Sequence, residues 1–394
     1  MKIGIDATCW WNNRGFGRFT RELLSALFEL DSPHRFHLFS DQPIDALARY
    51  DNVDFTLVTS SRPTTEAAVA DSSRSPFDML RLSRAVASTP LDLMFFPAVY
   101  SWFPVPRRLP TMLTVLDAIA EHFPDLIFPN WRSRLLWTIK MRGALWGSER
   151  VLTISHAARE EIVEYLGVDP AIIDVCSCAP NPQFRRTDDA ALIAAARARA
   201  NVPAGVPIIV YVGGLAPHKN LHGLLDGFEK ACAAGQVGEL HLALVGDFDG
   251  AGFYSNYDSL AERVGGSGAL QGRVHFTGYV SDDDLVALYS SARAAAMPSY
   301  SEGFGLPAIE AMACGAPVLS SDRGSLPEVV GDAGIYFDPF DPDAIARAIV
   351  AMASDDALHA RLAATGLERA REFTWERAAR LALGHLENFG RSAA

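Results

Sequence analysis

The sequence has few cysteines and no long apolar run, and these two features exclude several classes of protein. Five cysteines without a CxxC pair occur among 394 residues: Cys9, Cys176, Cys178, Cys232 and Cys314. Disulfide frameworks and cysteine metal sites use paired spacings, so we expect neither, and we expect a reducing, cytoplasmic setting. No apolar run reaches the roughly 18 residues of a membrane span. The acid Asp6 argues against a signal peptide.

Positive charge and metal-ligand spacings are also scarce. Lys and Arg number 35 against 47 Asp and Glu, a net charge of −12. Residues 1–186 hold 20 basic and 21 acidic residues, and the remainder hold 15 and 26. Neither half is basic, so general nucleic-acid binding is disfavoured. No His, Cys and Asp cluster has the spacing of a metal site, so we expect no metal and no bound cofactor.

The sequence does contain two runs in which apolar strands alternate with amphipathic helices. We expect strands at 2–8, 36–39, 53–58, 91–96, 111–116, 150–154, 208–212, 240–245, 273–277, 294–298, 318–320 and 334–337. We expect helices at 18–30, 78–87, 155–166 and 221–234 and in the tail from 341, with a break at 373–376. This alternation predicts an α/β protein with two Rossmann-like parallel sheets.

Composition also suggests where the two domains end. A proline-rich stretch and an Ala/Arg helix separate the two alternating runs. We therefore predict an N-terminal domain at 1–186, a linker at 187–206, a second domain at 207–372 and a C-terminal helix at 373–394. Two comparable α/β halves imply a ligand cleft between them.

The stretch from Pro298 to Gly315 carries the strongest chemical signal. Glu302 and Glu310 stand eight positions apart, separated by a glycine loop and by Pro307, which suits a first helical turn. The stretch reads as strand end, loop and short helix, which together form a concavity for an anion. The alternative is an ordinary strand–loop–helix connection with a solvated glutamate.

Other polar or glycine-rich positions follow predicted strands, where ligands bind in parallel sheets. They are Gly15 and Gly17, Asp117, Gly213 and Gly214 with Lys219, and the Tyr279-Val280 turn. Lysine offers a point charge for a phosphate, and glycines let a ligand approach the backbone. Each position has a simpler explanation: a structural turn, a helix cap or a solvated lysine. A nicotinamide dehydrogenase is disfavoured, because no full GxGxxG is present.

Several of these motifs together resemble one known family. They are Glu302-Gly-Phe-Gly-Leu-Pro, Glu310-Ala-Met-Ala, Gly324-Ser-Leu-Pro-Glu328, Gly213-Gly-Leu-Ala-Pro-His-Lys219-Asn, Phe276-Thr-Gly-Tyr-Val280 and Arg14-Gly-Phe-Gly-Arg-Phe19. The chain is similar to retaining GT-B glycosyltransferases of family 4, and most similar to bacterial polysaccharide mannosyltransferases. The resemblance implies two domains facing across a cleft, with the C-terminal helix crossing back to the first. It also implies transfer of a hexose or 6-deoxyhexose, of mannose or rhamnose type, from a nucleotide diphosphate sugar to a glycan or lipid-linked acceptor.

The resemblance also implies roles for particular residues. Glu302, Lys219 and Asp117 would be catalytic, with Glu302 beside the transferred sugar and Lys219 on the leaving phosphate. The donor would be bound by Gly15, Gly17, Gly213, Gly214, Lys219, Tyr279, Val280, Glu302, Gly303, Phe304, Gly305, Leu306 and Glu310. Within that set, Glu310 would hold the ribose. Catalysis would be mainly positional and electrostatic.

Two departures from the family pattern bear on specificity. Leu116 precedes Asp117 where most relatives have histidine, which suggests an apolar pocket suited to a 6-deoxy sugar, or a side chain supplied from elsewhere, such as His122. Many relatives also pair the lysine of the phosphate loop with an arginine that this chain lacks, so Arg14 or Arg18 would supply the second cation. The competing functions are a sugar-nucleotide epimerase and a non-catalytic nucleotide-sugar binder.

A basic and aromatic segment at 131–150 falls outside these motifs. It contains five basic residues and three tryptophans, which is compatible with a helix lying on the inner membrane surface. The alternative is a core-packed helix with a charged outer face.

Overall fold

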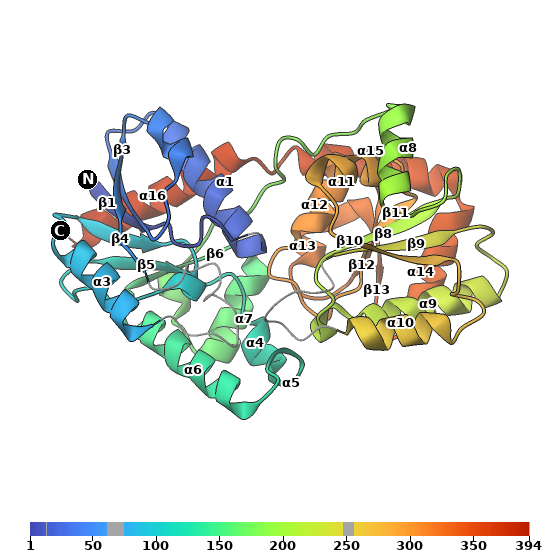
Figure 1. The fold of residues 1–394 in the computed structure, drawn as a ribbon, viewed down its shortest axis with the longest axis horizontal. Coiled ribbons are helices and arrows are strands. Elements are labelled where there is room, and N and C mark those ends of the chain that lie inside the picture. Colours follow the sequence, from blue (N-terminus) through green and yellow to red (C-terminus); the bar gives the residue numbers. More distant parts are fainter. Residues whose placement is uncertain (13, 61–74, 247–255, 394) are drawn as a thin grey trace. The chain divides into compact units, whose positions relative to one another are not determined.

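The computed structural model describes residues 1–12, 14–60, 75–246 and 256–393, which form two compact units (Figure 1). The first comprises Met1–Pro124, Phe128–Cys178 and Thr374–Ala394, and the second comprises Asp125–Ile127 and Ala179–Phe373. Each unit contains a parallel sheet with helices on both faces, which confirms the predicted pair of Rossmann-like folds. The first sheet has the order β3-β2-β1-β4-β5-β6-β7 and the second β10-β9-β8-β11-β12-β13 in the described part of the chain.

The strands of the first unit are short and mostly buried. They are β1 (Lys2–Asp6), β2 (Arg35–Ser40), β3 (Val53–Leu57), β4 (Leu93–Phe96), β5 (Thr111–Thr114), β6 (Arg150–Thr153) and β7 (Ile173–Val175). Ile3 on β1 is paired with Phe36 on β2 on one side and with Leu93 on β4 on the other. Our predicted strands match β1 to β6, whereas β7 has only three residues and was not predicted, because so short a run has no clear period.

Helices cover the first sheet on both faces. They are α1 (Gly15–Glu29), α3 (Pro76–Ala87), α4 (Ile119–His122), α6 (Trp131–Trp146), α7 (His156–Leu166) and α16 (Trp375–Ala393), with 3₁₀ turns η1 (Asp45–Arg49), η2 (Val99–Ser101) and η3 (Pro170–Ile172). The short helix α5 (Pro124–Ile127) falls mostly within the second unit. The side chain of Asn130 caps α6 and that of Ser155 caps α7. Helix α1 begins at Gly15, three residues before our prediction, so Gly15 and Gly17 lie in its first turn rather than in a loop.

The second unit repeats this layered arrangement. Its strands are β8 (Ile208–Val212), β9 (His241–Val245), β10 (Val274–Gly278), β11 (Ala294–Met297), β12 (Val318–Ser321) and β13 (Gly334–Phe337). In β8, Ile209 and Tyr211 point into the core that the sheet shares with α9 and α14. Ile208 and Val210 point into the opposite core, which includes α11. Both faces of the strand are therefore buried, as a parallel sheet requires.

The helices of the second unit include one inside the predicted linker. They are α8 (Ala190–Arg199), α9 (Leu221–Ala233), α10 (Tyr257–Gly265), α11 (Asp282–Ser290), α12 (Leu306–Ala313), α13 (Leu326–Val330), α14 (Pro342–Ser354) and α15 (Asp356–Ala370), with η4 (Pro217–Lys219) and η5 (Gly331–Ala333). Buried Arg197 on α8 donates to the Ser291 carbonyl at the end of α11 (3.1 Å). This contact holds α8 within the second unit.

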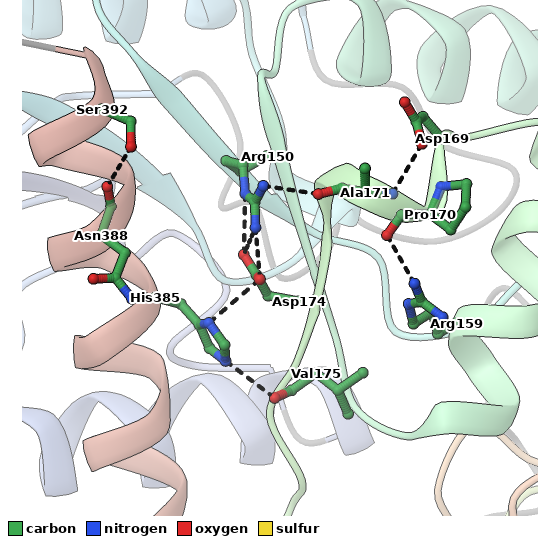
Figure 2. Close-up of polar contacts among 10 residues, drawn as sticks. All are labelled: Arg150, Arg159, Asp169, Pro170, Ala171, Asp174, Val175, His385, Asn388 and Ser392. Atoms are coloured by element: carbon green, nitrogen blue, oxygen red, sulfur yellow. Dashed lines mark hydrogen bonds and ion pairs between the residues drawn. The ribbon is translucent and has the colours of Figure 1, made fainter.

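The C-terminal helix returns to the first unit, as the resemblance implied. Trp375 on α16 lies 6.1 Å from Phe19 on α1, measured between ring centroids. Figure 2 shows the polar contacts at the sheet edge, where Arg150 on β6 forms an ion pair with Asp174 on β7 (2.6 Å). His385 on α16 donates from Nε2 to the Val175 carbonyl (3.3 Å), and its Nδ1 lies 3.4 Å from Asp174. These contacts fix the last helix against strands that lie some 210 residues earlier.

Candidate active site

The loop between β11 and α12 places Glu302 in a rigid, nearly buried position. Gly305 adopts a left-handed conformation (φ +89°), which lets the chain turn directly into α12. The Glu302 carbonyl accepts hydrogen bonds from the Ser325 amide (3.1 Å) and hydroxyl (2.8 Å). A Cβ atom on Gly324 would lie 2.8 Å from the Glu302 nitrogen, so glycine is required for this close approach. The backbone of the loop is therefore fixed by α13 and the turn before it.

Lys219 and Glu302, 83 positions apart, form an ion pair. Lys219 Nζ donates to both carboxylate oxygens of Glu302, at 2.8 and 2.9 Å. The Ser299 hydroxyl donates to Glu302 Oε1 at 2.6 Å. An ammonium group has three N–H donors, so one remains for a ligand, and Glu302 Oε2 retains acceptor capacity. The pair thus presents one donor for a phosphate oxygen and one acceptor for a sugar hydroxyl.

Burial is the largest single influence on Glu302 and raises its pKa, because it disfavours the charged form. Lys219, Ser299 and His218 outweigh that influence together, so the pKa of Glu302 lies below its ordinary value. Burial and the neighbouring Lys219 lower the pKa of His218 to about 3. At neutral pH the site therefore holds a carboxylate and a neutral imidazole.

Asn220 joins the loop that contains Lys219 to two other strand ends. It adopts a left-handed conformation (φ +54°) and caps α9 by accepting from the Gly223 amide (3.3 Å). Its amide group donates to the carbonyls of Pro298 (3.0 Å) and Pro339 (2.7 Å). The Tyr300 amide also donates to the His218 carbonyl (3.0 Å). These bonds hold Lys219 in register with Glu302.

The other predicted residues of the second unit lie at or beside the same sheet edge. Gly213 follows β8 with φ +153°, and the Gly214 carbonyl accepts from the Tyr211 hydroxyl (2.7 Å). Tyr279 follows β10 with its ring exposed. Glu310 lies on the second turn of α12 and is almost fully buried. Gly303, Phe304 and Gly305 are buried in the loop, and Val280 and Leu306 are half-buried.

Gly15 and Gly17, predicted to bind the donor, lie on α1 in the first unit. A Cβ atom on Gly17 would lie 2.0 Å from the Asn12 carbonyl oxygen, so the chain can pass there only as glycine. A Cβ atom on Gly15 would meet open space. The first turn of α1 contains no acid, and Arg14 precedes it without a capping side chain. The amides of this turn suit an anion.

Asp117 and Leu116 follow β5 in the first unit. Asp117 accepts from the Ile119 amide (3.2 Å), which is an Asx turn leading into α4. Leu116 packs against an apolar cluster that includes Phe16 at the start of α1. The structure thus brings the Leu116-Asp117 site together with the glycine-containing turn of α1. His122, considered as a substitute histidine, instead stacks between Phe123 and Tyr165.

The sequence motifs include Asn220, Gly324 and Ser325 but do not show that these residues position the acid and the lysine. Ser299, Gly324 and Ser325 act on Glu302, and Asn220 holds Lys219 in place. Asn220 had a signal, since asparagine directly before a predicted helix is a typical N-cap. Nothing in the sequence indicates which way Ser299 points.

Comparison with known proteins identifies the family. Residues 193–369 match the family described as glycosyl transferases group 1. The O-antigen chain mannosyltransferase B of Escherichia coli is 31% identical over 274 residues, covering 70% of this chain and 69% of the relative. This chain belongs to the group 1 glycosyl transferases. The resemblance of the chain to glycosyltransferase family 4 is thereby confirmed. The chain is a retaining hexosyltransferase.

Two further comparisons extend over nearly the whole of this group 1 glycosyl transferase. The serotype-specific mannosyltransferase WbdA of Escherichia coli is 26% identical over 97% of this chain, which spans only 47% of that relative. The crystal structure of Anabaena Alr3699/HepE in complex with UDP-glucose has a TM-score of 0.72 at 19% identity. It covers 98% of this chain and 100% of its own, which shows a shared fold.

Proposed function

We propose that this glycosyltransferase moves a mannose- or rhamnose-type sugar from a nucleotide diphosphate donor to a glycan or lipid-linked saccharide during surface polysaccharide synthesis. The observation that carries the proposal is the Lys219–Glu302 pair at the glycine loop before α12. Two relatives support the product class, because both are described as mannosyltransferases, one of them of the O-antigen chain. The five free cysteines are consistent with a reaction in the reducing cytoplasm.

In this proposal the donor binds with its charged parts against the second unit. Glu310 accepts from the ribose hydroxyls, and the backbone at Tyr279 and Val280 contacts the base. The amides of the loop at Gly303 and of the first turn of α12 hold the sugar and the diphosphate. The Lys219 ammonium group lies against the phosphate next to the sugar and neutralises charge as it develops there.

The proposed transfer needs no dedicated protein base. The bond between the sugar C1 and the phosphate oxygen breaks, and the acceptor oxygen bonds to C1 on the same face. The acceptor proton passes to the departing phosphate oxygen. Glu302 contacts the sugar hydroxyls as a carboxylate, the form that its lowered pKa favours at neutral pH. The proposal also keeps Gly15 and Gly17 as donor-binding residues and Asp117 as a catalytic residue, the roles that the family resemblance implies.

The proposal is tested with a panel of labelled nucleotide sugars and a lipid-linked acceptor extract. We expect transfer of label to the acceptor from a mannose or rhamnose donor. An epimerised donor without acceptor product would contradict the proposal, and so would donor binding without either product.

Leu116 provides a test of which of the two sugars is used. Its apolar packing against Phe16 supports a donor that lacks a 6-hydroxyl group. We expect the unmodified enzyme to prefer rhamnose donors and Leu116→His to shift the kcat/KM ratio toward mannose by about tenfold, the effect of one added hydrogen bond. Leu192→His, on exposed α8, is the control. A clear preference of the unmodified enzyme for mannose would exclude the 6-deoxy assignment while leaving the transferase proposal intact.

A further inference from the structure

Trp11 is a tryptophan at the carboxyl edge of the first sheet whose ring is open to solvent. It lies in the turn that follows β1 and is 45% exposed, whereas its neighbours Trp10 and Asn12 are buried. In parallel sheets, ligands bind outside the carboxyl ends of the strands. The first unit therefore presents an apolar ring at the edge of the sheet where a ligand is expected.

The backbone on both sides of Trp11 is held in place. Arg21 on α1 donates from Nη1 to the carbonyls of Trp10 (2.6 Å) and Asn12 (2.7 Å). The Asn12 amide also donates to the Cys9 carbonyl (3.0 Å), which closes the turn. A single guanidinium group thus fixes the turn to the helix that follows it, with Trp11 between its two contacts.

The ring of Trp11 is held as well. Its indole N–H donates to the Pro43 carbonyl (3.1 Å), in the segment that follows β2. This bond uses the one polar group of the indole, so the exposed part of the ring is hydrocarbon. An isolated exposed apolar residue would by itself carry no meaning. Because backbone and ring are both fixed here, a ligand that packs on Trp11 loses little side-chain entropy.

An amide side chain lies next to the carbonyl that fixes this ring. Gln42 directly precedes Pro43 and is half-buried, and its backbone amide donates to the Ser40 hydroxyl (3.2 Å). Its side-chain amide forms no hydrogen bond with the described residues, so two donors and one acceptor remain for a ligand. A fixed aromatic face with an amide nearby suits a sugar ring, which has C–H groups on its face and hydroxyl groups at its rim.

We propose that Trp11 is a stacking platform for one sugar ring of the acceptor, and that the Gln42 amide binds hydroxyl groups of the same ring. The inference rests on the proposed function, in which the acceptor is a saccharide. There the base, the ribose and the diphosphate of the donor lie against the second unit, which leaves the Trp11 edge of the first unit for the acceptor. Trp11 binds the acceptor and takes no part in the bond changes.

Fluorine NMR of the full chain labelled with fluorotryptophan tests saccharide binding without a donor. The chain has seven tryptophans, and the signal of Trp11 is the one that Trp11→Phe removes. We expect trisaccharides of mannose or of rhamnose to shift this signal in a saturable way. The signal of Trp131, identified by Trp131→Phe, is the matched control and should not move, because Trp131 is a similarly exposed tryptophan on α6.

Kinetics with the same trisaccharides as acceptors separate binding from chemistry. Trp11→Ala should raise the acceptor KM about tenfold and leave kcat and the donor KM unchanged, because the ring contacts only the acceptor. Trp11→Phe keeps an aromatic face and should raise the acceptor KM only about threefold. Gln42→Ala should raise it about fivefold, the effect of one lost hydrogen bond. Trp131→Ala should change none of these constants, and thermal melts check that each variant is folded.

Several outcomes would overturn the platform. These are a Trp11 signal that neither trisaccharide moves, a Trp131 signal that moves equally, and an acceptor KM that Trp11→Ala leaves unchanged. A Trp11 signal that UDP or GDP shifts and the trisaccharides do not would assign the ring to the donor base instead. Failure of the proposed function gives a different result: no labelled donor supports transfer, while a saccharide still shifts the Trp11 signal.

Discussion

Replacing Lys219 with alanine tests both the stability and the chemistry of the candidate site. The Lys219–Glu302 pair has its charges 2.8 Å apart, with side chains 22% and 11% exposed. At an effective dielectric constant of about 20, their gross attraction is about 6 kcal/mol. Desolvation of both groups cancels much of this attraction. Removing one partner of a buried pair still costs about 3–5 kcal/mol, because the other charge stays behind.

We expect Lys219→Ala to lower the free energy of unfolding by about 2–3 kcal/mol, below that range because Glu302 can take up a proton. The double variant Lys219→Ala with Glu302→Gln should recover most of this loss, since it leaves no buried charge. Lys230→Ala is the control, because its pair with Asp343 is largely exposed and surface pairs contribute little. Urea unfolding measures all four proteins.

The stability deficit of Lys219→Ala should depend on pH with a definite sign. The pKa of Glu302 is lowered in the folded protein, so its stabilisation is fully present above its unfolded value of 4.5. That stabilisation is lost as the pH falls through the folded pKa. The difference between the unmodified protein and Lys219→Ala should therefore shrink at acid pH. A deficit that stays constant with pH would contradict the ion-pair explanation.

Activity separates the role of Lys219 toward the donor from its role in stability. Below the unfolding temperature, Lys219→Ala should lower kcat about 10²–10³-fold, the effect of losing one stabilising charge on a leaving group. The double variant should regain stability but not activity. Near-normal turnover in Lys219→Ala would refute the phosphate role.

Two further predictions concern a helix start and a histidine pair. Gly17→Ala should destabilise the protein by about 1–2 kcal/mol and weaken donor binding, because the added methyl group would meet the Asn12 carbonyl at 2.0 Å. Gly15→Ala, into open space, should be neutral or stabilising in the same thermal melts. The hydrogen-bonded rings of His241 and His275 (2.8 Å) both have pKa values lowered, mainly by burial. The free energy of unfolding should thus fall as the pH drops below about 6.5, because the unfolded state then binds more protons than the folded state. His275→Gln should make that fall shallower. An unchanged dependence of stability on pH in this variant would contradict the role assigned to the two histidines.

The order of the strands and helices and the local motifs could be predicted from the amino-acid sequence alone. Strands such as β8 and β13 have the predicted bounds, because buried runs between turn residues leave little ambiguity. The loop with Glu302 and Gly305 and the helix α12 that follows could be predicted for the same reason, since their conformation depends on neighbours within a few residues. Family membership followed from these local motifs.

Contacts between residues that are far apart in the chain are visible only in the folded structure. The contact of Lys219 with Glu302 spans 83 residues and that of Leu116 with Phe16 spans 100, so neither leaves a local periodic signal. The start of α1 at Gly15 depends on how closely Gly17 approaches Asn12. The sequence left two interpretations of α6 open, and the packing against the sheet turned Trp131 and Ile139 outward. Apolar residues on both sides of a helix cannot show which side the core will cover, because only packing against the sheet makes that choice.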